Sequence, residues 1–148
     1  MQKLKATLGN PAWICFTWFG VTAGVSLLAT PLRFSAPTVT RAIGLDIGRV
    51  VFTALNKLEI VALIILLVVV RVSGRARIWW GICATLVLIV MLQSVWLLPE
   101  LSERARMIVS GVEPPASYLH ALYSTSELCK LGLLLLAGFV ALGEKAER

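Results

Sequence analysis

Five polar residues inside otherwise apolar stretches are the first candidates for chemistry in this sequence. Asn56, Lys57 and Glu59 belong to one stretch, and Glu127 and Lys130 belong to another. A charge at the centre of a membrane-inserted helix costs about 2.5 to 3.5 kcal/mol, so such groups usually face the interior of a helix bundle and find partners there. We therefore expect these residues to form a polar cluster between helices.

Helical spacing predicts how the cluster is arranged. Asn56 and Glu59 are three residues apart and share a helix face, as do Glu127 and Lys130, whereas Lys57 lies about 160° from Glu59 and cannot pair with it. Lys57 can instead extend its side chain toward the lipid headgroups. Asn56 and Glu59 should therefore face Glu127 and Lys130 across the bundle.

Two hypotheses for this cluster stay open. It could be a structural clamp, in which hydrogen bonds hold the helices together. It could also bind or relay a proton, an ion or the polar head of a substrate, because two carboxylates that share one cation can leave one of them protonated.

Other residues that often carry chemistry give little sign of it here. His120 is the single histidine, so the chain cannot supply two histidine ligands to a haem, and we expect an interfacial hydrogen-bonding role for it. Cys15, Cys83 and Cys129 lie in three different apolar stretches without a CxxC motif. We predict no metal, no cofactor and no catalytic residue, and an enzyme is the less favoured alternative.

The elements that must position these residues are long and apolar. Of the 148 residues, 58% are hydrophobic and only 15% are charged, against about 25% charged residues in soluble domains. Apolar runs of about 20 residues are long enough to cross about 30 Å of hydrocarbon as helices. The sequence predicts an all-α fold, a single integral membrane four-helix bundle over residues 1–148, with spans at about 12–32, 50–70, 78–98 and 118–142.

Basic residues predict the orientation of these spans. Seven lie at the two termini and in the short loop after the second span, and five lie in the other two loops. Because cytoplasmic loops are enriched in Lys and Arg, we expect both termini in the cytoplasm. The formal net charge of +6 fits this role and contact with the lipid bilayer, and we expect no nucleic-acid partner. The seven are Lys3, Lys5, Arg71, Arg75, Arg77, Lys145 and Arg148.

Segments around the spans give further expectations. Residues 34–48 form either a short amphipathic segment in the headgroup layer or a plain loop, and Glu100, Glu103 and Glu113 belong to a polar turn. Gly20 and Gly24 form a GxxxG motif, for which packing within the bundle is favoured over dimerisation. Five tryptophans are expected as interfacial anchors: Trp13, Trp18, Trp79, Trp80 and Trp96.

An offset of 68 residues aligns the two halves of the chain. It superimposes Pro31 on Pro99 and Glu59 on Glu127, and it also matches Ser26 with Ser94. A tandem duplication of a helix pair would explain these matches and would place the two glutamates at symmetric positions. Chance matches among apolar residues are the other explanation.

Short motifs give the chain a family resemblance. The segments "WFGVTAGVSLLATPLRF", "IGRVVFTALNKLEIV" and "YLHALYSTSELCKLGLLLLAG" resemble a bacterial membrane family of unknown function that is related to transmembrane protein 205. The similarity rests on a Pro-x-x-Phe corner, here Pro31 and Phe34, on a Gly-x-x-x-Phe entry, here Gly48 and Phe52, and on His120. It implies a four-helix membrane protein without an established reaction.

These observations favour a non-enzymatic multi-pass protein of the inner membrane that acts by binding. We expect an accessory subunit of a larger membrane complex or a small self-associating module, with a membrane protein or a second copy as partner. The alternative is a transporter or channel component in which Glu59, Glu127 and Lys130 bind a proton, an ion or a polar substrate.

Overall fold

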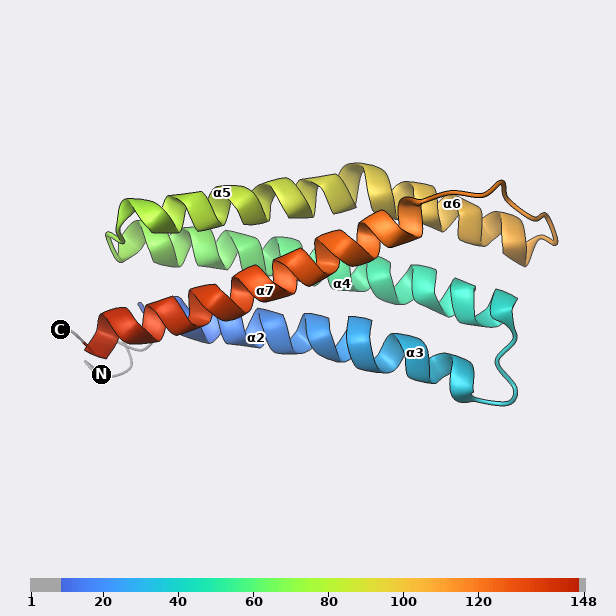
Figure 1. Ribbon diagram of the computed structural model, residues 1–148, viewed down its shortest axis with the longest axis horizontal. Helices are drawn as coiled ribbons and strands as arrows, with labels where there is room; N and C mark the ends of the chain where they lie inside the picture. Colours follow the sequence, from blue (N-terminus) through green and yellow to red (C-terminus); the bar gives the residue numbers. More distant parts are fainter. Residues whose placement is uncertain (1–8, 147–148) are drawn as a thin grey trace.

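The computed structural model describes residues 9–146 and shows an all-α bundle of four helical rods, as the sequence predicts (Figure 1). Two of the rods are interrupted by π-helical segments. In chain order the elements are α2 (Ala12–Ala23), the π segment η1 (Gly24–Ala29), α3 (Thr30–Leu32), the 3-10 turn η2 (Arg33–Ser35), α4 (Arg41–Val72), α5 (Arg77–Leu92), the π segment η3 (Gln93–Leu97), α6 (Leu98–Val109) and α7 (Leu119–Ala146).

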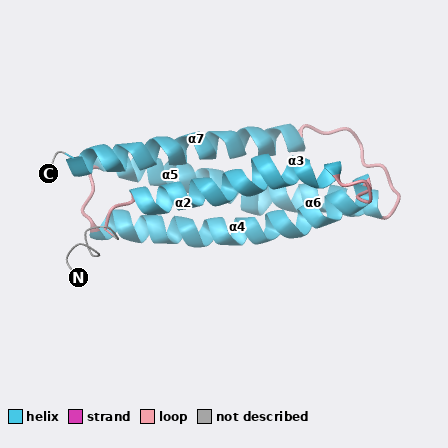
Figure 2. Ribbon diagram, turned by 90° about the horizontal axis from the view of Figure 1, so that it is seen from below, coloured by secondary structure: helices cyan, strands magenta, loops and turns pink. Residues whose placement is uncertain are grey.

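Within the described residues, four helical rods are long and apolar enough to cross a membrane: Ala12–Ser35, Arg41–Val72, Arg77–Val109 and Leu119–Glu144. The described ends of the chain, residues 9 and 146, lie at the same end of the bundle as the 73–76 turn, which we call the terminal end, and the two longer connections lie together at the opposite, loop end (Figures 1 and 2). The chain is a multi-pass membrane bundle. Lys3, Lys5 and Arg148, on which part of the predicted orientation rests, are outside the described residues.

The helices extend further at the loop end than the sequence predicts. Residues 41–48 are neither a loop nor a separate amphipathic segment, because they form the first two turns of α4, which Thr40 caps by accepting a hydrogen bond from the Ile43 amide at 3.3 Å. Glu100 and Glu103 likewise lie in α6, not in a turn. Interspersed Gly, Asp and Arg residues hide these turns from a hydropathy pattern.

The two glycines in this first part of α4, Gly44 and Gly48, allow η2 to pack closely against the helix. A Cβ atom at Gly48 would lie 2.6 Å from Nη1 of Arg33, and one at Gly44 would overlap the ring of Phe34. The Pro-x-x-Phe corner and the glycines of α4 are thus one packing unit. This unit places the Arg33 side chain at the loop end of the bundle.

Both π segments precede a proline. The amide of Thr30, before Pro31, donates to the carbonyl of Val25, five residues back, and the amide of Leu98, before Pro99, donates in the same way to Gln93. Proline has no N–H and its ring displaces the preceding turn, which favours a wider helical turn. The two π segments fall on matching positions of the 68-residue offset and support the duplication.

The structure contradicts two of the sequence predictions in part: that all five tryptophans are interfacial anchors, and that the GxxxG motif packs within the bundle. Trp18 and Trp79 are buried, and their indole N–H groups donate to Glu59 and Glu144. Each indole N–H thus has a carboxylate partner within the protein, Glu59 in the interior and the partly buried Glu144 at the terminal end, which an interfacial anchor does not need. Gly20 and Gly24 are exposed, and a Cβ atom at either would meet nothing within 4 Å, so the GxxxG motif does not pack within the bundle.

The bundle is held by apolar packing in its terminal half. Helix α7 packs along α2, where a Cβ atom on Gly138 would lie 2.6 Å from the ring of Phe16. In this half α4 packs against α5, and toward the loop end α4 packs against α6. The buried core includes Cys15, Trp18, Leu63, Leu66, Val70, Trp79, Cys83, Leu86, Val90, Leu134, Ala137 and Ala141.

Candidate functional site

Lys130 is the centre of a buried ionic cluster. Its side chain is 0% exposed, and its ammonium nitrogen lies 2.6 Å from Oε1 of Glu59, 2.8 Å from Oε2 of Glu127 and 2.8 Å from Oε1 of Gln93. An ammonium group has three donors, and here each has an acceptor. The three acceptors come from α4, α7 and η3, so Lys130 ties three of the four rods together.

The carboxylate of Glu59 is bonded on one side only. Its Oε1 accepts from Trp18 at 3.1 Å and from Thr22 at 3.0 Å in addition to Lys130, which brings α2 into the cluster. Its Oε2 is buried and has no hydrogen-bond partner among the described residues. A bare carboxylate oxygen in an apolar interior is costly and leaves one position where a proton or a water could be accommodated.

The carboxylate of Glu127 has partners on both oxygens. Its Oε1 accepts from Ser26 at 2.8 Å, and its Oε2 accepts from Gln93 at 2.9 Å as well as from Lys130. The Gln93 amide also donates to Ser126 at 2.9 Å. Glu127 is therefore a fixed, fully bonded acceptor.

The structure brings together three of the five residues that the sequence singles out. Glu59, Glu127 and Lys130 are in direct contact, whereas Asn56 is buried one turn from Glu59 and donates to Ser94 at 2.9 Å. Lys57 is exposed on the outer side of α4 and takes no part in the cluster.

Several members of the cluster were not anticipated. Trp18, Thr22 and Ser26 come from the first span, and Gln93 comes from the third. A signal was present in the sequence, because residues 18, 22 and 26 recur every four positions and so share one helix face. Ser26 lies in η1 and Gln93 in η3, and both side chains contact Glu127. These π segments cannot be foreseen from hydropathy.

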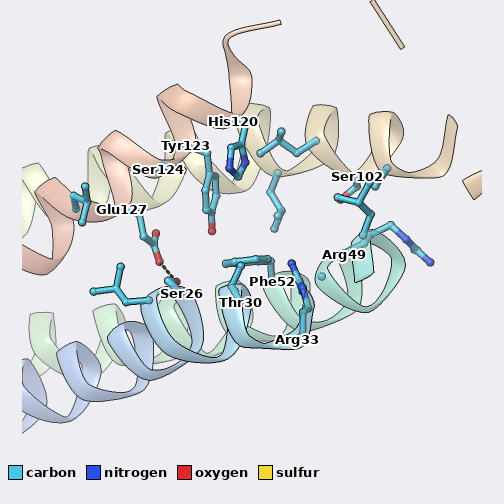
Figure 3. A pocket seen from close by; sticks show the side chains of 17 residues that line it. Ser26, Thr30, Arg33, Arg49, Phe52, Ser102, His120, Tyr123, Ser124 and Glu127 are labelled. Carbon is cyan, nitrogen blue, oxygen red and sulfur yellow. Dashed lines mark hydrogen bonds between the residues drawn. The ribbon is translucent and has the colours of Figure 1, made fainter. Parts of the chain in front are cut away.

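A cavity of about 290 Å³ adjoins the cluster on its loop-end side. Figure 3 shows Glu127 and Ser26 at its inner end, and Tyr123 and His120 pointing into it from α7. Most of its wall is apolar, and it receives residues from all four rods. They are Ser26, Leu27, Thr30, Arg33, Leu45, Gly48, Arg49, Phe52, Leu98, Leu101, Ser102, Ala105, His120, Tyr123, Ser124, Glu127 and Leu128.

Five polar side chains of this cavity have no hydrogen-bond or ion-pair partner within residues 9–146: Arg33, Ser102, His120, Tyr123 and Ser124. Arg33 makes only a cation–π contact with Phe34, 5.0 Å from the ring centroid, and its Nε is buried without an acceptor. Tyr123 is 7% exposed and packs edge-on against Phe52, which leaves its hydroxyl group directed into the cavity (Figure 3). His120 is exposed at the mouth. Arg49, by contrast, is paired with Asp46 at 2.8 Å.

The two sides of the cluster are chemically different. Toward the loop end the cavity and its polar groups lead to Glu127, whereas toward the terminal end Leu63, Leu66 and Leu134 begin the buried apolar core. The cavity thus leads a polar solute to the cluster from the loop end. Within the described residues, no group of three His, Cys, Asp or Glu side chains could hold a metal ion.

Comparisons with known proteins give no relative. No family model matches the chain, no curated protein matches it, and no solved structure matches the fold.

Proposed function

We propose that this chain is a non-enzymatic multi-pass membrane protein that acts by binding, with a small ligand in the cavity next to Glu127. The observation that carries the proposal is the cavity itself, which opens at the loop end and ends at the ionic cluster. Its volume of about 290 Å³ is at the lower end of the range of about 300 to 1,000 Å³ that is typical of small-molecule sites. We also propose that the chain is related to the bacterial family that it resembles, the one related to transmembrane protein 205, which implies a four-helix membrane protein without an established reaction.

We further propose that the protein works as an accessory subunit or as a self-associating module. The exposed GxxxG motif of α2 supports this, because Gly20 and Gly24 would let a second membrane helix approach closely. Lys57 supports it too, since an exposed charge near the middle of α4 is costly in hydrocarbon unless it reaches the headgroups or meets a partner.

Native mass spectrometry of protein purified in mild detergent tests both parts of this proposal. We expect a bound small molecule on the wild type and its loss in Ser124→Trp, whose indole would fill the cavity. Thr125→Trp, one residue further on the exposed side of α7, is the matched control and should keep the ligand. We also expect a dimer or a protein partner that is lost in Gly20→Leu but not in Val21→Leu. A monomer without bound ligand would contradict the proposal.

A transporter or channel component remains the second candidate, supported by the unpartnered Oε2 of Glu59. In that function the carboxylate would accept and release a proton or bind a cation during the cycle. The apolar core between the cluster and the terminal end would then have to open in a second conformation.

We also propose that the membrane is the bacterial inner membrane and that both termini are cytoplasmic. The exposed Ala76, in the turn between α4 and α5, offers a test together with the exposed Ala116 at the loop end. In a variant without Cys15, Cys83 and Cys129, Ala116→Cys should react with a membrane-impermeant maleimide in intact cells, whereas Ala76→Cys should react only after lysis. The reverse pattern would invert the orientation.

A further inference from the structure

We infer that the cavity ligand is a single-chain amphiphile with an oxyanion head, carboxylate or phosphate, held by Arg33. This inference rests on the proposed binding function and specifies its ligand class. Three observations support it: the polar groups of the cavity that lack a hydrogen-bond partner, the charge of those groups, and the place where the cavity reaches the apolar surface.

Arg33 is the free polar group of the cavity lining that can only donate, whereas the free hydroxyl groups and the His120 ring can either donate or accept. Glu127, the only acidic side chain of the lining, already accepts from Ser26, Gln93 and Lys130, so it has little capacity to bind a cationic ligand. Arg33 has no acceptor for its Nε, and the Tyr123 hydroxyl has no partner among the described residues. A ligand that satisfies this site must supply acceptor oxygens.

The charge at the loop end of the cavity favours an anion over a neutral acceptor. Arg49 is neutralised by Asp46, and the cluster at the inner end holds two glutamates for one lysine, so Arg33 is the unpaired cation of the cavity lining within the described residues. The guanidinium group lies against Gly48, where the missing side chain leaves room for it beside the α4 backbone. A planar guanidinium group binds carboxylate and phosphate oxygens with two parallel hydrogen bonds.

The opening fits an alkyl chain. Leu27 and Leu128 line the cavity and are 54% and 57% exposed, so besides its mouth at the loop end the cavity reaches the apolar surface of the bundle between the first and fourth rods. The cavity is large enough for a head group and several methylene groups. The rest of a single chain can leave between these leucines into the hydrocarbon, where it keeps its favourable apolar surroundings.

A photoreactive fatty acid with a diazirine close to its carboxyl group tests this inference in phosphatidylcholine nanodiscs. We expect light-dependent labelling of peptides from η1, α3 and the first turns of α7, and competition by decanoate or decyl phosphate but not by methyl decanoate or decyltrimethylammonium. The stronger of the two competing anions tells a carboxylate from a phosphate head. Arg33→Met should weaken apparent affinity about 10- to 100-fold, as loss of a charge-assisted contact predicts.

Matched variants separate the possible failures. Arg106→Met removes a positive charge from the same end of the bundle outside the cavity and should leave labelling unchanged. If the acid and its methyl ester label equally and Arg33→Met has no effect, while Ser124→Trp blocks both probes, the oxyanion inference is overturned and the binding function stands. If Ser124→Trp leaves all labelling unchanged, the cavity is not the site and both proposals fall.

Discussion

Replacing Lys130 by methionine should unfold or disassemble this bundle more readily than any other single substitution in the ionic cluster. Methionine matches the length of the lysine stem but leaves Glu59 and Glu127 as two carboxylates inside the bundle without their shared cation. Breaking a buried ion pair by removing one partner costs about 3 to 5 kcal/mol, because the remaining charge is uncompensated. The melting temperature of the purified protein, followed by detergent gel filtration after heating, measures this loss.

Lys57→Met is the matched control for that experiment. It makes the same change on α4, but Lys57 is exposed on the outer surface of that helix and has no role in the cluster. We expect an unchanged or slightly higher melting temperature, since a charge near the membrane interior is removed. Equal melting of Lys130→Met and the wild type would show that the cluster contributes nothing to assembly.

The sequence predicts the bundle well because lipid imposes a simple constraint. A helix in hydrocarbon must satisfy its own backbone and be apolar over about 20 residues, and both demands are visible in composition alone. The same constraint identifies Glu59, Glu127 and Lys130, because charges inside such spans stand out against their neighbours. Their helical spacing then fixes which of them can meet, and it correctly separates Lys57 from Glu59.

The remaining features depend on interactions that no linear pattern records. Gln93 and Ser26 reach the cluster from π segments, whose register follows from the prolines that come after them. Arg33 lies beside α4 because Gly48 leaves space for it, although the two residues are separated by a loop. Hydropathy does not predict the first turns of α4, because Arg41, Asp46 and Arg49 lie there, before the most apolar part of the helix.

The formal charge of the cluster predicts how the melting temperature changes when Glu59 and Glu127 are replaced by glutamine, and this experiment separates a structural clamp from a functional site. With both glutamates ionised, two carboxylates and one ammonium give a net charge of −1. Lys130→Met changes this to −2, either single glutamine variant changes it to zero, and Glu59→Gln with Glu127→Gln changes it to +1. Because uncompensated charge is costly inside the bundle, stability should be highest for the neutral clusters.

The geometry tolerates each single glutamine variant. In Glu59→Gln the amide oxygen can take the place of Oε1, with its three donors, and the NH₂ group can take the place of the unpartnered Oε2. In Glu127→Gln the NH₂ group can face Ser26, whose hydroxyl oxygen can accept a hydrogen bond. Each variant keeps one carboxylate for Lys130, so we expect melting temperatures equal to or above that of the wild type.

The double glutamine variant should lose about 3 to 5 kcal/mol, because Lys130 is then a buried cation without a carboxylate. Adding Lys130→Met to it makes the cluster neutral again and should restore most of the lost melting temperature. This pattern of tolerated single variants, a destabilised double variant and a rescued triple variant is the signature of a clamp.

Proton uptake by proteoliposomes, measured with a pH-sensitive dye inside them, addresses the transporter alternative. Glutamine preserves the hydrogen bonds of Glu59 but cannot ionise. A clamp is therefore not a sufficient account if the wild type takes up protons and Glu59→Gln abolishes that uptake without a change in melting temperature.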